Sequence, residues 1–140
     1  MNAMAILENN ILAHNKSTII HFDEGLIGFS DCKDFQLIED DAITPFRLLR
    51  SAEKKDVGFM LLEPTVVMAE YYKRIPAREW ESIALSTNEP LSAFVICIVG
   101  PSAKNSTGNF QAPLIVNCKK KIGRQLILTD AALSVRQPLI

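Results

Sequence analysis

The chain lacks several features that mark common classes of protein. Its three cysteines, Cys32, Cys97 and Cys118, form an odd set without CxxC spacing, which argues against a disulfide framework or a zinc site. Its 15 Lys and Arg residues nearly balance 16 Asp and Glu residues, so a formal charge of −1 supplies no field to gather nucleic acid or anionic lipid. We therefore expect a reducing, cytoplasmic location, without direct binding of nucleic acid or membrane.

Long apolar runs and grouped histidines are also missing. The longest apolar run, residues 93–99, is far too short to span a bilayer, and residues 1–12 lack the pattern of a signal peptide. The two histidines, His14 and His21, show no HxxxH or HEXXH spacing, and the later half has neither histidine nor paired carboxylates. We expect no metal, no cofactor and no enzymatic activity.

What the sequence does contain is the size and composition of one folded domain. It has 140 residues, of which 48% are hydrophobic, without internal repeats or linkers. We expect a single domain over residues 1–140, with residues 1–16 poorly ordered, and a monomer.

Short segments rich in β-branched and aromatic residues alternate with turns about every ten residues. This pattern predicts an all-β fold, a small antiparallel β-barrel-like domain. The expected strands are residues 17–22, 35–38, 45–49, 58–62, 94–99, 112–118 and 124–129.

The remaining segments predict turns and one short helix. Gly25 and Gly28 mark a turn, and the proline that opens residues 76–85 favours a helix there. Residues 65–72 fit strand or helix equally, and residues 102–108 predict a mobile loop. Residues 94–99 are apolar throughout, so we expect both faces of that strand to be covered and Cys97 to be a core thiol.

Hydrogen-bonding side chains among the apolar residues of the second half are candidates for a binding surface. Arginine and amide groups on a β scaffold suit a protein interface. The alternative, at least as good for the amides, is that they satisfy backbone groups of loops and edge strands. The set comprises Asn109, Gln111, Asn117, Arg124, Gln125, Arg136 and Gln137.

Several segments, in order, resemble the FliW flagellar assembly factor family. Residues 25–29 (GLIGF) resemble its G-L-P-G-F, and residues 107–117 (TGNFQAPLIVN) resemble T-V-N-L-Q-A-P-I-V-I-N. Residues 123–128 (GRQLIL) resemble G-R-Q-V-I-L, and residues 135–139 (VRQPL) resemble V-R-H-P-L. The resemblance runs from about residue 19 to the C-terminus, with Ile27 in place of a proline and Gln137 in place of a histidine.

The resemblance implies a β-barrel-like cytoplasmic protein that binds flagellin and, when free of flagellin, the translational regulator CsrA. Exchange between these partners would relieve the repression of flagellin translation by CsrA. We select Asn109, Gln111, Arg124 and Arg136 as protein-binding residues. The alternatives are a flagellin-dedicated chaperone that ignores CsrA, and a small β-barrel enzyme or ligand-binding protein.

Overall fold

The computed structural model of the protein describes residues 16–140. Poor order was expected over residues 1–16. Residues 1–15 lie outside the described range, and Lys16 is the first residue of the first strand. The described strands are β1 (Lys16–Phe22), β2 (Asp34–Glu39), β3 (Phe46–Ser51), β4 (Gly58–Leu62), β5 (Ala93–Ile98), β6 (Thr107–Gly108), β7 (Leu114–Asn117), β8 (Ile122–Gln125) and β9 (Gln137–Pro138). The helical elements are α2 (Ala77–Glu81) and the 3-10 turns Asp41–Ile43, Pro64–Val66, Tyr71–Arg74 and Ala103–Asn105.

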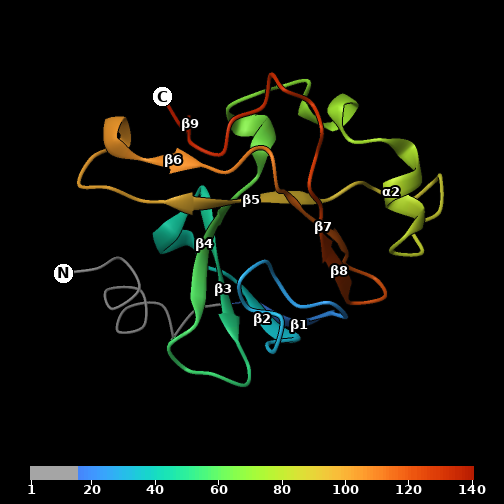
Figure 1. Cartoon of the computed structure of the whole chain (residues 1–140). Coiled ribbons are helices and arrows are strands. Elements are labelled where there is room, and N and C mark those ends of the chain that lie inside the picture. Colours follow the sequence, from blue (N-terminus) through green and yellow to red (C-terminus); the bar gives the residue numbers. More distant parts are fainter. Residues whose placement is uncertain (1–15) are drawn as a thin grey trace.

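Seven of these strands close into a barrel (Figure 1). They follow the order β4-β3-β2-β1-β8-β7-β5, and β5 pairs back to β4. Strands β6 and β9 continue outward from β5. Every pairing is antiparallel except that of β1 with β8, which is parallel and joins His21 to Ile122 and Phe22 to Gly123. The predicted β-barrel-like class with one short helix is confirmed. The parallel pairing of β1 with β8 was not predicted.

Apolar side chains pack on both sides of the barrel wall. The interior holds Phe22, Phe35 and Phe94, with the first two rings meeting edge to face at 5.6 Å. Along β5 successive side chains alternate between the two sides, so Val95 joins a second, outer cluster that includes Trp80. The segments between β4 and β5 and beyond β8 cover this outer side. In Figure 1 the segment beyond β8 passes above β5, and α2 lies to the right of it.

This two-sided packing explains why β5 is apolar throughout. From Ala93 to Cys97 it lies between both clusters, and burial raises the pKa of the Cys97 thiol to about 12. The predicted core thiol is confirmed. Ile98 and Val99 extend beyond the covered part, and Ile98 is 69% exposed. The prediction of covered faces over residues 94–99 is therefore wrong for these last two residues.

Two other predictions need correction, and one segment left open between strand and helix is now assigned. The helix is shorter than residues 76–85, because Ala84 adopts a left-handed backbone with φ 56° and the regular helix has ended at Glu81. Residues 65–72, compatible with either structure, enter two 3-10 turns. Residues 102–108 contain a 3-10 turn and then β6, so a loop over the whole range is wrong.

The predicted hairpin of β7 and β8 is confirmed, but its strands are shorter than expected. β7 spans Leu114–Asn117 instead of residues 112–118, and β8 spans Ile122–Gln125 instead of residues 124–129. Its tip carries Lys119, Lys120 and Lys121, all exposed to solvent. No helix in the described range is long and apolar enough to cross a membrane.

Candidate functional site

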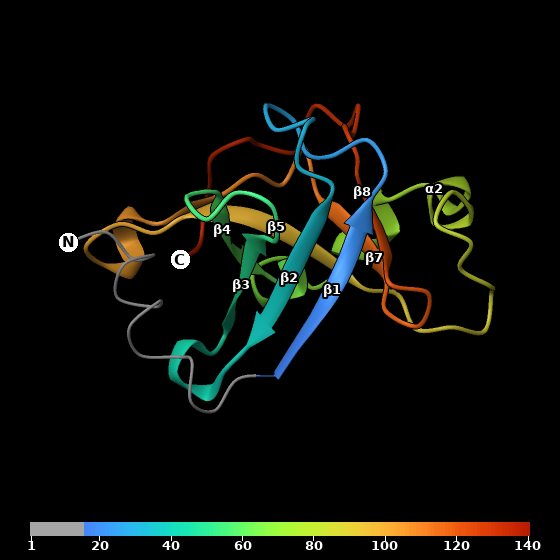
Figure 2. The ribbon, with the colours of Figure 1, turned by 90° about the horizontal axis from the view of Figure 1, so that it is seen from below.

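The site lies where β1 and β8 separate. Their pairing ends at Phe22 and Gly123, and the N–H of Gly25 then donates to the carbonyl of Phe22 at 2.9 Å, turning the chain away. Gly25 has φ 66°, and a Cβ there would lie 2.6 Å from the carbonyl oxygen of Phe29, so the tight turn needs glycine. Figure 2 shows the end of β1 beside β8, with the loop of residues 23–30 leaving from it.

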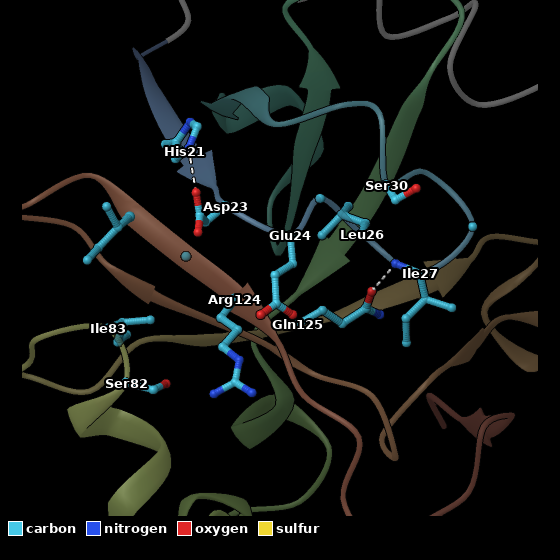
Figure 3. Close-up of a pocket in the computed structure, with 14 residues that line it drawn as sticks. His21, Asp23, Glu24, Leu26, Ile27, Ser30, Ser82, Ile83, Arg124 and Gln125 are labelled. Atoms are coloured by element: carbon cyan, nitrogen blue, oxygen red, sulfur yellow. Dashed lines mark hydrogen bonds and ion pairs between the residues drawn. The ribbon is translucent and has the colours of Figure 1, made fainter.

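A groove of about 690 Å³ separates this loop from the segment that follows α2. Its upper wall is the loop, including Leu26 and Ile27, and its lower wall includes Ser82 and Ile83 (Figure 3). All of β8, Ile122–Gln125, lines the groove. Because consecutive strand residues point to opposite faces, a groove that touches all of them runs along the edge of the strand.

Arg124 is the cation of the lower wall. Its Nη1 lies 3.4 Å from Oε2 of Glu79, longer than a typical charge-assisted hydrogen bond. Its Nε is buried and has no acceptor among the described residues, while 40% of the side chain remains exposed. The guanidinium therefore retains donor capacity that a ligand oxygen could use.

Gln125 fixes the upper wall. Its Oε1 accepts the N–H of Ile27 at 2.7 Å, and its Nε2 donates to the carbonyl of Ala112 at 3.2 Å. One side chain thus joins the glycine loop to the segment before β7. The loop is held with Ile27 59% exposed at its tip.

Acidic groups and a histidine complete the rim. His21 Nδ1 lies 2.7 Å from Oδ1 of Asp34, and its Nε2 lies 3.6 Å from Oδ1 of Asp23. The hydrogen bond to Asp34 raises the pKa of His21, helped by the charges of both carboxylates and opposed by slight desolvation. The Glu24 carboxylate points into the groove (Figure 3). Within the described residues, no three His, Cys, Asp or Glu side chains are grouped to hold a metal ion.

Of the four residues selected from the sequence, Arg124 lies in the groove. Asn109 caps a turn, because its Oδ1 accepts the N–H groups of Gln111 and Ala112 at 3.2 and 3.1 Å. Gln111 is half-buried, and its carbonyl accepts a hydrogen bond from the backbone. Arg136 is exposed just before β9, which pairs with β6. The structure does not gather the four into one site, and a role in partner binding stays a prediction for each.

The alternative interpretation of the amides holds for four of the five, including Gln137, whose Nε2 donates to the Pro138 carbonyl at 3.4 Å. Asn109 and Gln125 satisfy backbone groups as described, and so does Asn117, which is fully buried. Its Nδ2 donates to the Ile83 carbonyl at 2.9 Å and its Oδ1 accepts the Lys120 N–H at 3.1 Å. Sequence reasoning missed the upper wall of the groove, because the glycines predicted a turn but not its position against β8.

Comparison with known proteins places these features in a family context. The family model described as FliW protein matches residues 8–139. The chain is 33% identical over 128 residues to the flagellar assembly factor FliW of Natranaerobius thermophilus, covering 89% of this chain and 83% of the relative. It is 35% identical over 125 residues to the protein of that name from Carboxydothermus hydrogenoformans, covering 89% and 80%. A crystal structure of the flagellar assembly factor FliW superposes with a TM-score of 0.77 at 30% identity, covering 87% of this chain and 85% of the other.

Proposed function

The chain belongs to the FliW family, and on that basis we propose that it is a cytoplasmic flagellar assembly factor that works by binding other proteins. The proposed partners are flagellin and the translational regulator CsrA. While flagellin accumulates, it occupies the protein. Once flagellin is secreted, the free protein binds CsrA and relieves the repression of flagellin translation.

The observation that carries this proposal is the extent of the match. The family model spans residues 8–139, and relatives named flagellar assembly factors share 33 to 35% identity over 89% of the chain. The similarity therefore reaches the whole barrel and its outer covering, including the strand-edge groove. Flagellin and CsrA as partners follow from the resemblance of the C-terminal segments to the family.

The groove chemistry supports recognition of a protein rather than a reaction. It combines apolar walls at Leu26 and Ile27 with hydrogen-bonding groups on Arg124 and Gln125. A few polar groups set among apolar ones are typical of protein interfaces.

Calorimetric titration of the purified protein with flagellin and with CsrA, each at low and high salt, tests the proposal. We expect binding to both partners, and release of CsrA when flagellin is added to the complex. Binding to flagellin alone would leave a flagellin-dedicated chaperone. Binding to neither would refute the proposed function.

A further inference from the structure

Among residues 16–140, one edge of the extended segment that follows Gly123 has no neighbouring strand. The N–H groups of Leu126 and Leu128 each donate at 2.8 Å, to the carbonyls of Pro113 and Gln111. The segment therefore stays extended beyond Gln125 and faces the chain that leads into β7. Alternate residues of an extended chain direct their backbone groups to opposite edges, so those of Gln125 and Ile127 face away.

The backbone groups of Gln125 and Ile127 point to the same side of the strand on which β1 pairs with residues 122 and 123. The pairing of β1 with β8 stops at Gly123. Within the described part of the chain, the N–H group of Ile127 forms no backbone hydrogen bond. The alternation set by Leu126 and Leu128 directs the N–H group of Gln125 away from β7 as well. The groove lies beside this edge, and 72% of Ile127 is exposed.

We propose that the groove binds an extended segment of a partner protein, which adds to the edge of residues 125–127 as a further strand. This inference rests on the proposed function and names how a partner is held. Backbone donors and acceptors spaced along a strand edge are matched by another extended polypeptide. Its side chains on one face would meet Ile27, which is 59% exposed, and those on the other would bring an oxygen acceptor to Arg124.

The protection of the two sheet edges supports this assignment. Strand β9, at the end of the sheet order, contains Pro138, and proline has no N–H to offer an incoming strand. The edge at residues 125–127 has no proline, and an exposed isoleucine lies on it. The groove is also preformed, because Gln125 holds the opposite wall in place, which lowers the entropy lost on binding.

The test replaces Ile127 in two ways. Ile127→Pro removes the outward N–H and blocks strand addition, while Ile127→Thr shortens the same side chain and keeps the N–H. Both leave the hydrogen bonds of Leu126 and Leu128 possible, and the melting temperature of each variant checks the fold. Titration with purified flagellin and CsrA should show at least a tenfold loss of affinity for one partner in Ile127→Pro, and less than about threefold in Ile127→Thr.

Each outcome bears on a different claim. Unchanged affinity in Ile127→Pro overturns strand addition and leaves the proposed function intact, and equal losses in both variants point to a side-chain contact instead. A wild-type protein that binds neither partner refutes the proposed function, and this inference with it. A wild-type dimer that Ile127→Pro converts to a monomer would make the occupant a second copy.

A second measurement needs no variant. In the complex of the wild-type protein, hydrogen exchange of the Gln125 and Ile127 amides should slow at least tenfold on partner binding. Unchanged exchange at both amides would overturn strand addition even if Ile127→Pro failed to fold.

Discussion

Replacing Gln125 with alanine should loosen the glycine loop without unfolding the barrel. The side chain accepts the Ile27 N–H at 2.7 Å and donates to the Ala112 carbonyl at 3.2 Å. Its removal leaves the first group to water and the second, in a buried residue, without this donor. The loop should then lose its fixed distance from β8.

The size of the effect follows from these two bonds. A hydrogen bond of this kind contributes about 0.5–1.5 kcal/mol net, and the bond to Ile27 is exposed. We therefore expect Gln125→Ala to lower the free energy of unfolding by about 1–2 kcal/mol. For a domain of this size the melting temperature should fall by roughly 3–8 °C.

Urea denaturation gives the free energy, and hydrogen exchange followed by NMR gives the local effect. The Ile27 amide should exchange faster in Gln125→Ala by at least several-fold, while amides of β2 and β3 keep their order of protection. Gln125→Glu is the control for the Ile27 bond, because it retains an acceptor for the Ile27 N–H, although it replaces the donor to Ala112 with a charged oxygen. If the Ile27 amide of Gln125→Ala exchanges at the wild-type rate, the Gln125 side chain does not hold the loop in place.

Three further predictions concern other parts of the molecule. Tyr71→Phe removes the buried 2.6 Å bond to the Phe110 carbonyl and should cost about 1–3 kcal/mol, measured by urea denaturation. The pKa of His21 is raised in the folded protein. Its contribution to the free energy of unfolding is therefore fully present below the unfolded pKa of about 6.5, and it is lost as the pH rises through the folded pKa. Unfolding free energies from pH 5 to 8 should show this fall, and His21→Gln should flatten it. Arg136→Ala should weaken partner binding, measured calorimetrically, more than it lowers the melting temperature, since its side chain is exposed; comparable losses would make it structural.

Local pattern was sufficient for most of the strands. Residues 58–62 were predicted as a strand and form β4 with the same bounds, because a compact apolar run ends there at Glu63 and a proline. The helix was placed correctly but made too long. Its pattern continued to Leu85, whereas the regular helix ends at Glu81 and Ala84 adopts a left-handed backbone, a position that glycine usually marks and alanine does not.

Long-range features could not be read in the same way. Nothing in the residues around His21 indicates a parallel partner near Ile122, because that pairing depends on how the barrel closes. The groove at this junction could therefore not be predicted from the sequence. Arg124 was selected for its chemistry and does line the groove, but Asn109, selected on the same grounds, caps a turn. Amides serve interfaces and turns alike, so residue type alone does not separate the two uses.

The single parallel pairing also sets when the barrel can close while the chain is being synthesised. Strands β1 to β4 follow one another and pair with their neighbours in sequence, so this meander can form early on the ribosome. The barrel closes only after β7 and β8 have been made, because β8 joins β1 to β7. Until then the growing chain carries an unpaired edge at β1, and the edge of β4 is unpaired until β5 has been made. Such edges are the places where a nascent sheet aggregates.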